Sequence, residues 1–116
     1  KILIIEDEVR ISQLLKMYLE RELFLTDVVD NGDDGLERAI QEDFDLILLD
    51  VLMQGKDGYM VLEEIRRIKN TPVIMLSAKG GENEIQRAYD LGVNQYILKP
   101  FSPRNVVAKI KQLFLE

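Results

Sequence analysis

The chain has 116 residues, the size of one ordinary domain, and its 47% apolar and 31% charged residues are typical of a folded rather than a disordered chain. It contains neither cysteine nor histidine, which excludes disulfide scaffolds, thiol nucleophiles, zinc sites of the usual ligand types and histidine-based triads, so any chemistry must use carboxylates, hydroxyls and lysines. The formal net charge of −6 argues against a domain that holds nucleic acid through its own electrostatic field.

The first part of the chain reads as two strand–helix units. The apolar run from Ile2 to Ile5 has the length and branched side chains of a strand that is buried on both faces, as in a parallel sheet. Apolar residues then recur at helical spacing from Ile11 to Leu19, which predicts an amphipathic helix. A weaker run from Leu25 to Val29, interrupted by polar residues, fits an edge strand. A short, weakly amphipathic helix is expected at Gly32 to Gln41.

The rest of the chain repeats this alternation. Strand-length apolar runs occur at Leu46 to Leu49, Val73 to Leu76 and Tyr96 to Leu98. Helical spacing marks two segments between them, at Val61 to Ile68 and at Ile85 to Tyr89. Each strand is therefore followed by a helix along the chain.

The last helix is marked by its own start signals. Ser102 is a typical N-cap, Pro103 suits the first helical position, and apolar residues continue at helical spacing to Phe114. Strands joined through helices pair in parallel with right-handed crossovers, so the pattern predicts a (βα)5 α/β fold, a doubly wound five-stranded parallel sheet. With the weak strand at an edge, the strand order is 2-1-3-4-5, and ligands bind beyond the carboxyl ends of strands 1 and 3.

Side chains suited to binding a cation or a phosphoryl group follow four of these strands. Glu6 and Asp7 follow the first strand, Asp50 ends the third, Ser77 follows the fourth and Lys99 the fifth. Repulsion among three nearby carboxylates is relieved by raised pKa values or by a bound cation, and oxygen-only ligands favour Mg²⁺. Any one of the acidic residues alone fits a helix N-cap or a turn equally well, whereas the whole set with a lysine opposite favours a site.

The combination of residues in this set points to phosphoryl transfer. A cation and an ammonium group offset the charge on the transferring oxygens, and a carboxylate nucleophile yields an acyl phosphate. Asp50 lies at the centre of the set and follows an apolar run that holds it in place. We therefore expect Asp50 to accept the phosphoryl group.

Five segments of the chain resemble the response-regulator receiver family of bacterial two-component signalling, in the correct order and over nearly the whole length. They are ILIIEDE (Ile2 to Glu8), DLILLD (Asp45 to Asp50), DG (Asp57 and Gly58), PVIMLSA (Pro72 to Ala78) and LGVNQYILKPFSP (Leu91 to Pro103). Each fragment is a weak signal, but five in register are a strong one. The resemblance implies a flavodoxin-like receiver domain over residues 1–116 that acts as a signalling switch rather than an enzyme.

The resemblance also implies a ligand set. Asp50 would be the phosphorylation site, and Mg²⁺ would be bound by Asp7 and Asp50, by Glu6 largely through water, and by the backbone carbonyl of Leu52. The family usually has proline where this chain has Gln54, and we expect this to affect the rigidity of the loop.

Three further residues receive roles from the resemblance. Lys99 would pair with the phosphoryl group, Ser77 would close onto a phosphoryl oxygen and draw its loop inward, and Tyr96 would rotate from exposed to buried. The bond from Lys99 to Pro100 would be cis. Without the resemblance, Ser77 is equally a plain loop hydroxyl, Tyr96 a strand aromatic with a solvated tip, and Lys99 a solvated cation.

Three other positions in these loops are of interest. Lys56 brings a cation toward the acidic residues at the strand ends, where its repulsion of a bound metal ion would weaken metal binding. By the resemblance, Leu52 and Lys79 occupy positions that tune the lifetime of the phosphoryl group.

The stretch from Lys99 to Arg104 resembles OmpR-type transcription factors. This implies a sensor histidine kinase as partner. It also implies a C-terminal winged-helix effector domain, and DNA would be bound only through that domain. After phosphorylation, a homodimer would form through helix 4, strand 5 and helix 5. The charged residues of that dimer face are Glu82, Glu84, Asp90, Arg104, Lys109 and Lys111. They also fit ordinary solvated helix faces, and Asn94 and Gln95 replace the acidic residues common there in that subfamily.

The ends and the hydropathy of the chain bear on its setting. No apolar run approaches the roughly 20 residues of a membrane span, and no apolar leader opens the sequence, so we expect a cytosolic protein without a membrane partner. The sequence begins without methionine and ends inside an amphipathic pattern, which indicates a piece of a longer protein.

Three other functions fit these residues less well than the phosphorylated switch. An aspartyl-nucleophile phosphatase would carry a second aspartate as general acid at the position of Leu52, which cannot transfer a proton. A nucleotide binder would need a glycine-rich phosphate loop, and Gly80-Gly81 has neither the Walker spacing nor the lysine that follows it. A receiver that signals without phosphorylation is disfavoured by the intact acidic set.

Overall fold

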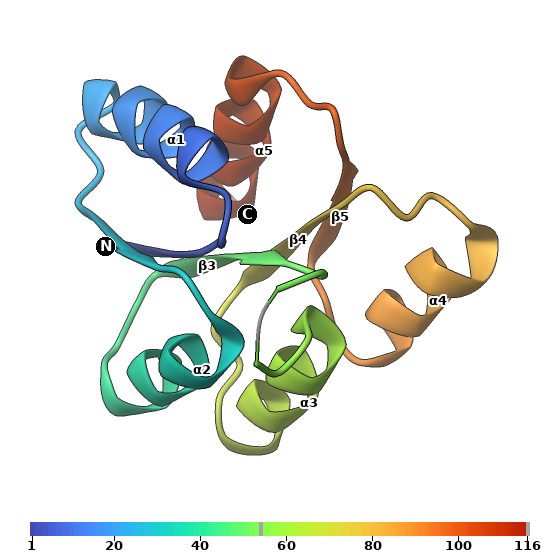
Figure 1. Ribbon diagram of the computed structural model, residues 1–116. Coiled ribbons are helices and arrows are strands. Elements are labelled where there is room, and N and C mark those ends of the chain that lie inside the picture. The colour runs from blue at the N-terminus through green and yellow to red at the C-terminus, as the bar shows by residue number, and fades with distance from the viewer. Residues whose placement is uncertain (54, 116) are drawn as a thin grey trace.

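The computed structural model describes residues 1–53 and 55–115 and alternates strands with helices along the chain (Figure 1). The elements are β1 (Ile2–Ile5), α1 (Val9–Arg21), β2 (Thr26–Val29), α2 (Gly32–Gln41), β3 (Leu46–Asp50), α3 (Gly58–Ile68), β4 (Val73–Ser77), α4 (Glu82–Asp90), β5 (Gln95–Leu98) and α5 (Pro103–Leu115). All strand pairs are parallel, in the order β2-β1-β3-β4-β5, which confirms the predicted fold class and strand order.

The sheet separates two apolar cores because successive strand side chains point to opposite faces. Helices α1 and α5 cover one face, and α2, α3 and α4 lie on the other (Figure 1). In β1, Leu3 and Ile5 pack with the second group, whereas Ile2 and Ile4 pack with α1 and α5. The central strands are thus buried at every position, which explains their unbroken apolar runs.

At their carboxyl ends, two strands extend one residue beyond the predicted apolar runs. Asp50 closes β3 in register with Leu76, and Ser77 closes β4 in register with Leu98. Both polar residues are buried, and their backbones belong to the sheet rather than to the following loops. The parallel alignment therefore holds these two side chains at the same edge of the sheet, where β1 also ends.

The helices begin at residues that their local chemistry favours. Asp57 caps α3 by accepting a hydrogen bond from the Met60 amide at 2.9 Å, and Asn31 caps α2 in the same way. Helix α5 begins at Pro103, as predicted. Among the described residues, no helix is both long enough and apolar enough to cross a membrane.

Candidate functional site

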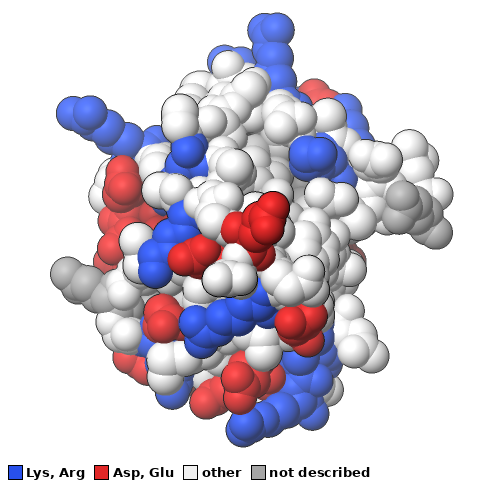
Figure 2. Space-filling model, turned by 90° about the vertical axis from the view of Figure 1, so that its right-hand side faces the viewer, with Lys and Arg blue, Asp and Glu red and all other residues white. Residues whose placement is uncertain are grey.

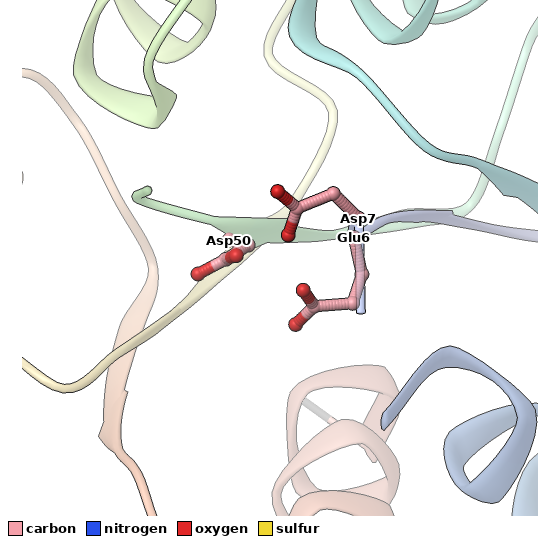
Figure 3. Close-up of side chains that lie close together, drawn as sticks. All are labelled: Glu6, Asp7 and Asp50. Carbon is pink, nitrogen blue, oxygen red and sulfur yellow. The ribbon is translucent and has the colours of Figure 1, made fainter. Parts of the chain in front are cut away.

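Three acidic side chains meet at the carboxyl ends of β1 and β3 (Figure 3). Glu6 and Asp7 follow β1, Asp50 ends β3, and each contributes a carboxylate oxygen within 4.8 Å of the others. Glu6 and Asp50 are only 1% and 3% exposed, whereas Asp7 is half-buried. The structure therefore brings together the three carboxylates that the sequence placed at strand ends; we call them the acidic triad.

Lys99 supplies the positive charge beside the acidic triad. Its ammonium nitrogen lies 3.0 Å from Oε1 of Glu6 and 3.1 Å from Oδ1 of Asp50, donating a hydrogen bond to each. Burial works to lower the pKa of Lys99, but hydrogen bonds and charge from Glu6 and Asp50 outweigh it and raise that pKa above its usual value. The bond from Lys99 to Pro100 is cis, as the resemblance implied.

The acidic triad still carries an excess of negative charge, because one ammonium group faces three carboxylates. Burial raises the pKa of Glu6 to about 7, and Asp50 adds to the rise, against the Glu8 amide and Lys99, which lower it. Three closely spaced carboxylates that offer only oxygen atoms fit a hard divalent cation such as Mg²⁺. The site can thus hold a dication beside the Asp50 carboxylate.

Ser77 and Tyr96 both contact the loop between β4 and α4. The Ser77 hydroxyl accepts a hydrogen bond from the Lys79 amide at 2.9 Å, and the Tyr96 hydroxyl donates one to the Lys79 carbonyl at 2.8 Å. Ser77 is buried and Tyr96 is half-buried. The sequence did not indicate that Lys79 joins the two, because both contacts use its backbone and leave no signal in its side chain.

Lys56, which follows Asp50 by six residues, has an acidic partner on α3. The Lys56 ammonium lies 3.6 Å from Oε1 of Glu64 on α3, so this carboxylate offsets the charge that Lys56 brings to this side of the molecule. Leu52 has a largely exposed side chain, and the role of its carbonyl as a ligand remains a prediction. Gln54 lies outside the described residues.

The predicted dimer face combines charges from two helices. Figure 2 shows the side of the molecule on which α4 lies, with acidic and basic side chains interspersed. The six residues named from the sequence lie on α4 (Glu82, Glu84 and Asp90) and on α5 (Arg104, Lys109 and Lys111). Two of them have partners within the chain, because Lys111 pairs with Glu22 of α1 and Asp90 accepts a hydrogen bond from Gln86.

Asn94, which departs from the OmpR-type pattern, has a structural role. Its side-chain oxygen accepts hydrogen bonds at 2.9 Å from the Val73 amide and from Arg66, joining α3, the start of β4 and the loop before β5. Arg66 also donates to the carbonyl oxygens of Thr71 and Gly92. An aspartate at position 94 would keep both accepted hydrogen bonds and turn the contact with Arg66 into an ion pair.

Comparison with known proteins adds independent information. Residues 2–111 match the family model described as "Response regulator receiver domain". The chain is 49% identical over 113 residues to the transcriptional regulatory protein ResD of Bacillus subtilis and 46% identical to SrrA of Staphylococcus aureus. Each alignment covers 97% of this chain and 47% of the relative, so the chain spans about half the length of these curated relatives.

Solved structures share the same fold. A two-component response regulator from Clostridium difficile superposes with a TM-score of 0.94 at 25% identity, covering 99% of this chain and 95% of that one. The BeF3-activated N-terminal receiver domain of RstA from Klebsiella pneumoniae gives a TM-score of 0.89 at 27% identity, covering 96% and 95%.

The raised pKa of Glu6 predicts a pH-dependent stability. Below the usual glutamate pKa of 4.5 the Glu6 side chain is protonated in both the folded and the unfolded chain, so its burial costs no charge. This advantage in folding free energy is lost as the pH rises through the folded pKa of about 7, because the folded protein must then bury a charged carboxylate. Glu6→Gln keeps an acceptor for Lys99 and the Glu8 amide but carries no charge. In EDTA at pH 8 we expect it to be more stable than the parent by about 1–3 kcal/mol, with the difference vanishing toward pH 4.5.

Urea unfolding at pH 5 and pH 8 measures this difference. Glu8→Gln is the matched control, because Glu8 is exposed and should leave the pH profile of the parent unchanged. An equal change in unfolding free energy at both pH values would contradict the conclusion that the charged Glu6 carboxylate destabilises the folded protein.

Proposed function

Because the chain belongs to the response regulator receiver family, we propose that it is a phosphorylation-dependent signalling switch whose phosphoacceptor is Asp50. The observation that carries the proposal is the position of the buried Asp50 carboxylate, which lies within the acidic triad and accepts a hydrogen bond from Lys99 at 3.1 Å. The phosphoryl donor is a sensor histidine kinase, the partner that membership of a two-component family implies.

The transfer is a displacement at phosphorus. A carboxylate oxygen of Asp50 forms the new bond to phosphorus as the bond to the donor breaks, giving an aspartyl phosphate and the released donor. Asp7, Asp50, Glu6 and the Leu52 carbonyl would hold Mg²⁺, which when bound supplies positive charge beside the transferring oxygens. Lys99 keeps its ammonium group next to Asp50 and offsets the charge of the phosphoryl group from the other side.

The response begins at the Lys79 backbone. The Ser77 hydroxyl donates a hydrogen bond to a phosphoryl oxygen while its oxygen still accepts one from the Lys79 amide, so movement of Ser77 toward Asp50 draws the loop inward. Tyr96 then leaves the Lys79 carbonyl and turns into the space that the loop vacates. We expect slow self-dephosphorylation but no turnover of external phosphate esters, because Leu52 cannot serve as the general acid that a phosphatase would need.

The output is inferred from the relatives. ResD and SrrA are named as transcriptional regulatory proteins, and this chain covers about half of each. We therefore propose that the domain acts in the cytosol and controls a C-terminal effector domain that regulates transcription and makes the contact with DNA.

Phosphorylation of Asp50 can be tested directly. Incubation with acetyl phosphate and Mg²⁺, followed by intact-mass spectrometry, is expected to add one phosphoryl group to the parent and none to Asp50→Asn. Asp43→Asn is the control, because Asp43 is fully exposed on the loop before β3 and should be modified like the parent. An adduct that survives Asp50→Asn, or no adduct in the parent, would disprove the mechanism.

The metal site has a separate test. Asp7→Asn removes one of three carboxylates and is expected to weaken Mg²⁺ binding about ten-fold or more, since affinity follows the charge of the ligands. Calorimetric titration with MgCl₂ measures the affinity, and Glu8→Gln controls for a change in nearby surface charge. Unchanged affinity in Asp7→Asn would remove Asp7 from the ligand set.

We further propose that the active form is a symmetric dimer through α4, β5 and α5. Acidic α4 of one copy would face basic α5 of the other. Since Lys111 already pairs with Glu22, we expect Arg104 and Lys109 to supply most of the attraction.

Sedimentation of the Mg²⁺-bound protein with and without beryllofluoride tests the dimer. We expect a monomer without beryllofluoride, a dimer with it, and weaker dimerisation for Arg104→Glu. Arg10→Glu on α1 is the matched charge reversal, because Arg10 is exposed and lies outside the proposed face. A monomer in both states rejects the dimer.

A further inference from the structure

Helix α4 is attached to the rest of the domain by unusually few buried residues. Of its nine residues, all of which the structure describes, Ala88 alone is buried, whereas α3 buries five. Its N-cap residue is Gly81, which has no side chain to cap the helix. Beyond its C-terminal end lies Gly92, whose φ of +97° favours glycine. Figure 1 shows α4 at the periphery of the sheet. The position of α4 must therefore depend on individual side-chain contacts.

Tyr59 of α3 makes two of these contacts. Its side chain is 3% exposed, and its hydroxyl donates a hydrogen bond to the Glu84 carbonyl at 3.1 Å. The guanidinium of Arg87 lies 4.2 Å from the centre of the Tyr59 ring, within the range of a cation–π contact. Glu84 and Arg87 are three residues apart and so lie on one face of α4. Tyr59 thus contacts one turn of α4 through both its hydroxyl and its ring.

The first turn of α3 connects Tyr59 to Asp50. The Gly58 amide donates a hydrogen bond to the Val51 carbonyl at 2.8 Å. A Cβ atom at position 58 would lie only 2.5 Å from the backbone oxygen of Asp50, so the start of α3 packs directly on the backbone of the acceptor residue. A shift of the backbone at Asp50 therefore reaches Tyr59 through one intervening residue.

We propose that Tyr59 is a positioning residue that holds α4 in its resting place and links that place to Asp50 through the first turn of α3. This link runs through α3, whereas the one at Lys79 runs through the loop that precedes α4, which Ser77 and Tyr96 contact. The Tyr96 side chain also packs against the core cluster that contains Tyr59. Burial raises the pKa of Tyr59, so its hydroxyl stays protonated and able to donate. The signalling consequence rests on the proposed function, whereas the contact itself belongs to the unphosphorylated protein.

Hydrogen exchange of the metal-free, unphosphorylated protein tests the contact. Tyr59→Phe removes one oxygen atom and leaves the ring in the core, so we expect the amides of α4 to exchange about five-fold faster, the factor of one net hydrogen bond, with β1 and β3 unchanged. Tyr89→Phe is the matched control, because Tyr89 is on the same helix but is 44% exposed, and it should exchange like the parent. Unchanged α4 exchange in Tyr59→Phe, or equal acceleration throughout the domain, overturns the proposal.

Binding of beryllofluoride with Mg²⁺ tests the link to Asp50. If the Tyr59 hydroxyl stabilises the resting state, removing it favours the state that beryllofluoride selects. The Tyr59→Phe variant should then bind beryllofluoride about five-fold more tightly than the parent. Parent-like affinity together with accelerated α4 exchange would overturn the link. No beryllofluoride binding by the parent would instead count against the proposed function, and the exchange measurement would still decide whether Tyr59 holds α4.

Discussion

The site depends on the burial of two carboxylates, Glu6 and Asp50, against a single ammonium group from Lys99. Charges buried this deeply are costly unless they are paired, and removing one partner of such a pair leaves the other uncompensated. Asp7 adds a third carboxylate at the solvent-facing side of the same cluster. This arrangement favours any added positive charge beside Asp50, whose backbone is held in β3.

The fold keeps these charges together because they lie at the ends of parallel strands that are buried on both faces. The register of β1 with β3 pairs Ile5 with Leu49, so Glu6 and Asp50 follow at the same edge, and that of β4 with β5 places Ser77 opposite Leu98. A slip of one residue in either strand would turn the buried side chains to the wrong face of the sheet. The same apolar packing that stabilises the domain thus sets the distances in the acidic triad.

Much of this could be predicted from the sequence, for a physical reason. Buried parallel strands have unbroken apolar runs, and the polar residues that follow them must meet at one edge, so Glu6, Asp7, Asp50 and Lys99 could be assigned together. The contacts at Lys79 could not be predicted, because they involve backbone atoms. The pairing of Lys111 with Glu22 depends on how two helices lie side by side, which periodicity does not specify.

Helix α4 buries only one of its nine residues, and the proposed switch requires a helix held this lightly. The hydrogen bonds that hold the helix and its flanking loops include those from Tyr59 to Glu84, from Tyr96 to Lys79 and from Arg66 to Gly92. Each such bond contributes roughly 1 kcal/mol, so their sum is comparable to the few kcal/mol that separate two conformers of a switch. A helix that buries five residues, as α3 does, would resist a perturbation of that size. The division between a fixed α3, which begins against Asp50, and a lightly held α4 is therefore the physical basis that we propose for a change of the domain surface when Asp50 gains charge.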